Sequence, residues 1–412
     1  MSQSSGGPAP ASPLRPGFGE FVALLALMMG MTAFSIDNLL PAFGVIGADF
    51  ALTDPNRVQL LVYAYLIGIG AAQLIYGTLS DVVGRRPALA AGMLIYAGGC
   101  VLALVAQSFE TLILARVVQG VGAAAARVMA VAIVRDRVEG REMARIMSLV
   151  LMVFLTVPIV APAIGSLILM AGSWHLIFVA MLALAVALTT WFMLRMPETL
   201  HPEYRKPFSL RAIGAGMVTT LTNRRAVGYT LAVGFMTGAL MTYVGSASQI
   251  FQTDIYPLHE WFAAVFASVA ALMAVGSFLN ASLVRRIGMR RLSHGAACGF
   301  VAVSALLVGA SLAYAGRPPL LVLCGLIAAA QFLFALCVSN FNSIAMEPLG
   351  AVAGTAASFM GAFTTLMAAM LALGIGQAYD GTVLPLTMGY LGLGALTVLS
   401  VLWAEKWRLF GH

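Results

Sequence analysis

The stretch GTLSDVVGRRP, residues 77–87, joins two long apolar runs through a short polar turn that carries two adjacent arginines. Gly84 permits a tight reversal, because glycine adopts positive φ without a steric penalty. Arg85 and Arg86 suit an anionic cytoplasmic membrane surface, and Asp81 can pair with an arginine or cap a neighbouring helix. The stretch therefore predicts two membrane-spanning helices joined on the cytoplasmic side. A plain basic turn with no further role is the alternative for the arginines.

Composition extends this interpretation to the whole chain, because 61% of the 412 residues are hydrophobic and only 9% are charged. Apolar windows of about twenty residues recur from end to end and predict an all-α integral membrane protein. No cleavable signal is evident at the amino end. The four cysteines lack metal-ligand spacing, so we expect no metal site. The twelve predicted spans are 20–43, 57–79, 88–107, 110–134, 145–170, 175–196, 226–251, 260–284, 293–314, 318–345, 352–378 and 383–404.

The basic residues predict the orientation of these spans. Of 23 Lys and Arg residues, nineteen fall in tails and loops on one side, Arg57 and Arg317 fall on the other, and Arg116 and Arg127 lie inside a span. Excess positive charge marks the cytoplasmic side, so both termini are predicted to be cytoplasmic. The net charge of +7 is thereby a topology signal, and no nucleic-acid partner is expected.

The longest polar connection follows the sixth span and divides the spans six and six. Duplicated six-helix halves are an arrangement of secondary transporters, whose site lies between the halves near mid-depth. The predicted organisation is an N-terminal tail, a first half, a cytoplasmic linker, a second half and a C-terminal tail, at residues 1–19, 20–196, 197–225, 226–404 and 405–412.

Three elements carry a family resemblance. The turn at 77–87 resembles the GxLaDrxGRRP loop signature of the major facilitator superfamily. LARVVQGVGAAAARVMAVAIVRDR, residues 114–137, is similar to its RxxQGxgaa element, and VPIVAPAIGS, residues 157–166, resembles its antiporter motif, with Ala161 at a usual glycine. The resemblance implies the major facilitator fold and a conformational latch in the loop between the second and third spans. This latch does not touch substrate, and its residues are Gly77, Asp81, Gly84, Arg85 and Arg86.

Within that superfamily the chain is similar to the Bcr/CflA group of drug exporters. SIDNLLPAFGVI, residues 35–46, matches that group's first-span element, and AMEPLGAVAGTAASFMG, residues 345–361, matches a later one. The resemblance implies a multi-pass protein of the bacterial inner membrane that exchanges drugs for protons and confers antibiotic resistance. Helix kinks with close helix contacts are expected at Pro41, Pro158, Pro162 and Gly165.

Asp37 is the one acidic residue that falls clearly inside a predicted span. A charge in the bilayer centre is unfavourable by roughly 2.5 to 3.5 kcal/mol even on insertion scales, so such a residue turns inward and usually carries function. Helix rise places Asp37 and Arg116 at about the same depth, near 25 and 28 Å from the cytoplasmic side. We expect Asp37 to carry the proton, with Arg116 as its partner. A static ion pair between the two is the alternative.

Further polar and small residues complete the predicted substrate cavity. Arg127 shares a helical face with Arg116 and Ala123, although it could instead extend to the cytoplasmic surface. Embedded hydrogen-bonding groups line cavities less often than they hold helices together. The predicted cavity residues are Asp37, Tyr65, Arg116, Gln119, Ala123, Arg127, Tyr243, Gln249 and Asn340.

Other classes of function lack their signatures. The five histidines are scattered, so no catalytic cluster predicts an enzyme, and no Walker loop indicates ATP hydrolysis. The predicted function is proton-coupled export of a small amphipathic drug by alternating access, with no cofactor and the proton gradient as energy source. Export of a native metabolite, such as a sugar or amino-acid derivative, is the alternative. The expected partners are drug or metabolite, protons and membrane lipid, and the chain is expected to be a monomer.

Overall fold

The computed structural model describes residues 16–138, 140–201, 203 and 210–410, and this part of the chain contains helices and no strands. Within these residues, twelve helical segments are long and apolar enough to cross a membrane, as the sequence predicts. The first half contains α1 (Phe18–Asp37), η1 (Leu40–Ala42), α2 (Phe43–Asp49), η2 (Pro55–Gln59), α3 (Leu60–Val83), α4 (Arg85–Leu104), α5 (Phe109–Arg137), α6 (Gly140–Ala171) and α7 (His175–Arg195). The second half contains α9 (Arg224–Ser248), η4 (Gln249–Thr253), η5 (His259–Trp261), α10 (Phe262–Ile287), α11 (Met289–Ala313), α12 (Leu320–Met346), η6 (Glu347–Val352), α13 (Ala353–Gly376) and α14 (Leu384–Ala404).

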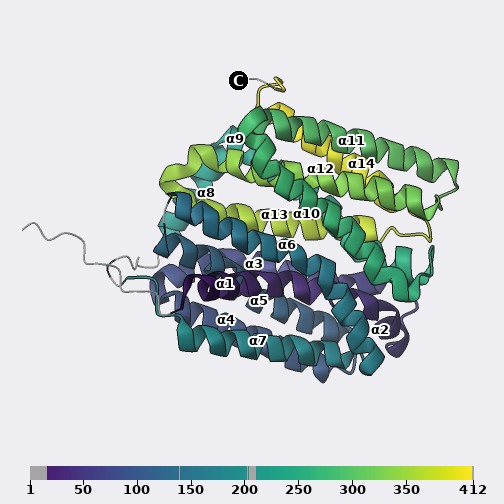
Figure 1. Ribbon diagram of the computed structural model, residues 1–412, viewed down its shortest axis with the longest axis horizontal. Helices are drawn as coiled ribbons and strands as arrows, with labels where there is room; N and C mark the ends of the chain where they lie inside the picture. The colour runs from purple at the N-terminus through teal and green to yellow at the C-terminus, as the bar shows by residue number, and fades with distance from the viewer. Residues whose placement is uncertain (1–15, 139, 202, 204–209, 411–412) are drawn as a thin grey trace, which may run out of the picture.

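The helices lie in two layers, with α1 and α3 to α7 in one and α9 to α14 in the other (Figure 1). The layers meet where α3 packs on α13 and α6 packs on α10. We call the end at which α1 begins and α14 ends the terminal end, and the opposite end the distal end. An even number of spans places both chain ends on one side.

One helix was not among the predicted elements. Inside the predicted linker 197–225, the chain forms α8 (Leu210–Thr222), which packs on α9, α13 and η6. Its thirteen residues are too few to cross a bilayer, which requires about twenty.

Small residues let the helices of the first half approach closely. A Cβ atom on Gly120 of α5 would overlap the carbonyl oxygen of Tyr65 on α3. Membrane helices pack through such contacts, because lipid supplies no hydrophobic drive for helix association. The glycine of the QG element thus fixes the distance between α3 and α5.

Candidate transport site at the break in the first span

Asp37 is the last residue of α1, where the first span breaks. Pro41 causes this break, because it has no backbone N–H and its ring clashes with the carbonyl four residues earlier, which is that of Asp37. The chain continues through η1 into α2. Pro41, where the sequence predicts a kink, lies directly after the end of α1, so the carboxylate of Asp37 stands at a helix interruption.

The Asp37 side chain is 5% exposed, and among the described residues it makes no hydrogen bond or ion pair. Polar atoms without partners lie before and after it in the same segment of the chain. The Thr32 hydroxyl and both side-chain atoms of Asn38 are buried and accept or donate no hydrogen bond within the described chain. Unsatisfied buried polar groups are rare in native proteins and mark functional or water-binding positions. This cluster has free capacity to bind a proton, water or a ligand.

Helix α6 packs tightly against the break. A Cβ atom on Gly165 would overlap the backbone carbonyl oxygen of Asn38, so only glycine fits. Pro158 and Pro162 lie inside α6, which continues through both from Gly140 to Ala171. Of the antiporter-like stretch, Gly165 therefore makes the contact with the break, and the two prolines leave the helix unbroken.

The predicted contact between Arg116 and Asp37 is absent from the described structure. Arg116 is fully buried, and its guanidinium donates to the carbonyls of Ser35 at 2.9 Å and Leu61 at 3.0 Å. It also donates to Gln119 at 2.9 Å and lies 4.4 Å above the ring of Tyr65. The expected ion pair is wrong for this conformation, because backbone carbonyls two residues from Asp37 and on α3 occupy the donors.

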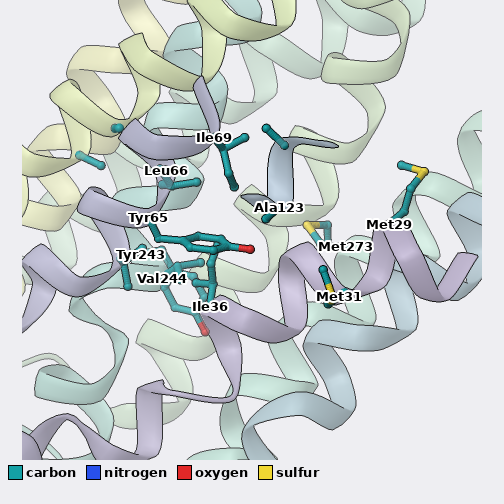
Figure 2. Packing of buried hydrophobic residues seen from close by; sticks show 14 of the residues in the cluster. Met29, Met31, Ile36, Tyr65, Leu66, Ile69, Ala123, Tyr243, Val244 and Met273 are labelled. Atoms are coloured by element: carbon teal, nitrogen blue, oxygen red, sulfur yellow. The ribbon is translucent and has the colours of Figure 1, made fainter. Parts of the chain in front are cut away.

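The other predicted cavity residues of the first half fall into two groups. Gln119 accepts from Arg116 and faces Cys100, so it lies within the half and away from the interface. Ala123 and Tyr65 belong to a buried cluster that α1, α3, α5, α9 and α10 share (Figure 2). Arg127 is partly exposed and makes no hydrogen bond within the described chain.

In the second half, the predicted cavity residue Tyr243 lies on α9. It is 2% exposed, and its hydroxyl has no hydrogen-bond partner in the described chain. Figure 2 shows it in one cluster with Ile36, the neighbour of Asp37. A buried tyrosine of the second half thus belongs to the cluster that adjoins the break.

Gln249 and Asn340 have other surroundings. Gln249 hydrogen-bonds Gln59 and, at 2.9 Å, Asn56, and so joins the two halves at the distal end. Asn340 donates to Asn280 at 2.7 Å and to a carbonyl of its own helix at 2.8 Å, within the second half. Gln249 is an interface residue and Asn340 a helix contact.

The polar turn after α3 is a charge network around Arg85, whose side chain is 3% exposed. Arg85 pairs with Asp81 at 2.6 Å and with Asp136 at 2.7 Å. Gly84 has φ +103°, which only glycine adopts readily, and Arg86 donates to the Met193 carbonyl at 2.7 Å. Gly77 packs directly against Ser358 of the second half.

Two acids of this network were not among the predicted site residues. Asp136 pairs with Arg85, and Glu198 accepts from the backbone N–H groups of Arg85 at 2.9 Å and Arg86 at 3.1 Å. A carboxylate at a helix start is stabilised by the helix dipole and free N–H groups. The signal was available in the sequence as acids at the terminal ends of the fourth and sixth spans.

The second half has its own network at the terminal end, centred on Glu405. Tyr229 donates to Glu405 at 2.9 Å, and Arg290 pairs with it at 3.1 Å. Burial alone would raise the pKa of Glu405, but the hydrogen bonds from Tyr229 and Arg290 and the charges of Arg290 and Arg225 outweigh it. The pKa of this carboxyl therefore lies below its ordinary value.

Comparison with known proteins identifies the family. A family model described as the Major Facilitator Superfamily matches residues 24–404. The MFS-type transporter YdgK of Bacillus subtilis, described as uncharacterized, is 30% identical over 354 residues, which cover 84% of this chain and 87% of its own. A bicyclomycin resistance protein homolog of Haemophilus influenzae is 27% identical over 386 residues, covering 93% and 94%.

A crystal structure of a D-xylose-proton symporter aligns with a TM-score of 0.73 at 14% identity, covering 94% of this chain and 97% of that one, and shows the fold alone. The bicyclomycin-resistance relative confirms the resemblance to the Bcr/CflA group. With its twelve spans, the chain is a multi-pass protein of the bacterial inner membrane and a transporter, not an enzyme. The chain belongs to the Major Facilitator Superfamily.

Proposed function

We propose that this protein is a proton-coupled exporter that exchanges small amphipathic drugs for protons by alternating access. The observation that carries the proposal is Asp37, a buried carboxylate without a protein counter-ion among the described residues, at a helix break between the halves. Removing a carboxylate from water favours its neutral, protonated form, and water access restores the charge. A group in this position can take up a proton on one side and release it on the other.

The surroundings of the break support an amphipathic substrate. The cluster around Tyr65 and Tyr243 is apolar and aromatic and comes from both halves, while Thr32, Asn38 and the Tyr243 hydroxyl supply a few unpaired polar atoms. Sites for small molecules typically combine such apolar walls with few polar groups. The relative named for bicyclomycin resistance supports a drug as substrate.

The energy source, the orientation and the assembly state belong to the same proposal. The proton gradient drives export without a cofactor, both termini lie in the cytoplasm, and the monomer is the working unit in the lipid bilayer. The terminal end carries the Arg85 and Arg290 networks, which agrees with a cytoplasmic location under the positive-inside rule.

A growth-inhibition panel tests the substrate class. Varied antibiotics are applied to a bacterial host without its own drug exporters, with the parent protein, with the Asp37→Asn variant, or with empty vector. We expect the parent to raise the inhibitory concentration of several amphipathic compounds at least fourfold and the variant to raise none. Protection against none of the compounds by a well-expressed parent would contradict drug export and favour a native metabolite.

A further inference from the structure

The distal end of α9 departs from regular α-helix and reaches toward the break in the first span. Residues Gln249–Thr253 form a π-helical turn. Such turns are rare and frequently occur at functional sites, because the wider turn re-aims the side chains that follow it. Here it presents Gln249 and Gln252 to the first half.

Gln252 is held in a fixed orientation. The Ser248 hydroxyl, 1% exposed, donates to the Gln252 side-chain oxygen at 2.9 Å. This bond identifies the oxygen and leaves the amide nitrogen Nε2 to donate to the carbonyl of Pro41 at 2.9 Å. The chain from Ser248 through Gln252 to Pro41 crosses between the halves.

Pro41 is the residue that ends α1 after Asp37, and it is buried. The hydrogen bond from Gln252 of the second half to the Pro41 carbonyl therefore fixes the short segment after α1. This segment determines the direction in which the Asp37 side chain points. We infer that Gln252 is a positioning residue. Its hydrogen bond links the helix break at Asp37 to α9, so that a change in the protonation state of the carboxylate shifts the second half. This inference rests on the proposed function of Asp37.

Few titratable groups near the break could change how Asp37 responds to pH. Tyr243 on α9 belongs to the buried cluster beside the break, and Arg116 on α5 is engaged by the Ser35 and Leu61 carbonyls. Helix α6, which packs on the break, carries no ionisable side chain from residue 146 to residue 171. A change in how Asp37 responds to pH after substitution of Gln252 is therefore attributable to the break itself.

The chain offers a matched control. Gln377 also donates through Nε2 to a backbone carbonyl of the first half, that of Asn56, at the same distance of 2.9 Å and at the same end of the bundle. It does not touch the break. If Gln252 served only to hold the halves together, the two glutamines would be equivalent.

The test compares the parent with Gln252→Met, Ser248→Ala, Gln377→Met and Asp37→Asn in proteoliposomes. Methionine keeps the length of glutamine and removes the donor. A compound that the parent exports in the growth panel serves as probe. Drug accumulation is measured across a range of pH at a constant pH difference, and equilibrium binding of the same drug confirms that each variant is folded.

We expect Gln252→Met to lower accumulation about fivefold, as the loss of one net hydrogen bond implies, and to displace the pH midpoint by about half a unit or more. Ser248→Ala should produce a smaller displacement in the same direction, and Gln377→Met none. The inference would be overturned if Gln252→Met and Gln377→Met had equal effects, or if Gln252→Met did not displace the pH midpoint. In either case the proposed function would stand, provided that Asp37→Asn abolishes coupling. Full coupling in Asp37→Asn would instead overturn the proposed function.

Discussion

At the level of single residues, the two buried charged groups near mid-depth have opposite environments. Arg116 is surrounded by acceptors from α1, α3 and α5, whereas Asp37 has no partner within the described chain. A fully hydrogen-bonded buried charge holds structure, and an unsatisfied one is available for change. We therefore assign Arg116 to the architecture of the first half and Asp37 to transport.

This division predicts a stability phenotype for Arg116. Arg116→Ala removes the donor of the Ser35 carbonyl, which lies buried in the last turn of α1, and an unsatisfied buried group of this kind is unfavourable by about 1–3 kcal/mol. The Leu61 carbonyl, inside α3, loses one bond and keeps its intrahelical donor. We expect a marked fall in the thermal unfolding temperature in detergent. Arg116→Lys should recover only part of it, because an ammonium cannot reproduce the planar, forked geometry of the guanidinium.

Arg127 provides the comparison, since it makes no hydrogen bond within the described chain. Arg127→Lys should change the unfolding temperature far less than Arg116→Lys. Equal stability losses at the two positions would contradict the structural role of Arg116.

The sequence identified Asp37 and Arg116 correctly as buried, but it did not show that Arg116 would bind backbone carbonyls instead of Asp37. Helix rise gives the depth of a residue, and both depths agreed. It does not give the direction in which a long side chain turns, and the Ser35 carbonyl was not visible as a competitor for Arg116. Tyr243, which belongs to the same buried cluster as Ile36, lies about two hundred residues away, where no spacing rule applies.

At the level of elements, the turn between α3 and α4 predicts unequal roles for its two acids. Asp136 is 12% exposed and contacts two nitrogens of Arg85, whereas Asp81 is 35% exposed and contacts one. Removing one partner of a buried pair is destabilising by roughly 3–5 kcal/mol, and Asp81 remains to offset part of that loss. Asp136→Asn should therefore destabilise the protein more than Asp81→Asn, as measured by thermal unfolding.

Both substitutions should lower turnover in reconstituted vesicles and leave equilibrium drug binding nearly unchanged, because the turn lies far from the break and tunes the balance of conformations. Turnover equal to the parent in both variants would remove the proposed latch role of this loop.

The Glu405 network predicts a pH dependence of stability. The folded-state pKa of Glu405 lies below its ordinary value, so its carboxylate stabilises the fold above that ordinary value. The stabilisation is lost as the pH falls through the folded-state pKa. We expect the unfolding temperature of the parent to fall more steeply below about pH 5 than that of Glu405→Gln. Parallel curves for the two proteins would contradict this contribution.

Helices could be predicted from the sequence where hydrophobicity alone determines that they form. All twelve spans were predicted because about twenty apolar residues are needed to cross a bilayer. Helix α8 was missed because it is short and lies among polar residues. Pro41 breaks the first span, while Pro158 and Pro162 lie within a continuous α6, because packed neighbours can satisfy the groups that proline releases.

At the level of the whole molecule, the two ends of the helix bundle are held together by different kinds of polar contact. The distal end joins the halves through neutral amides, among them Asn56, Gln59, Gln249 and Gln377. At the terminal end, the described ion pairs of Arg85 and Arg290 lie within one half each. The halves can therefore separate at either end without breaking one of these ion pairs, as alternating access requires.

The central claim is that Asp37 carries the proton, and Asp37→Asn tests it because asparagine imitates the size and polarity of the protonated form. Asp49→Asn is the matched control, since that carboxylate lies in the same span and only accepts a hydrogen bond from Trp174, which an amide oxygen can also do. The measurement is drug accumulation in proteoliposomes under an imposed pH gradient, together with equilibrium binding. We predict that Asp37→Asn binds drug but does not concentrate it, while Asp49→Asn behaves as the parent. Uphill accumulation by Asp37→Asn at the level of the parent would contradict the account.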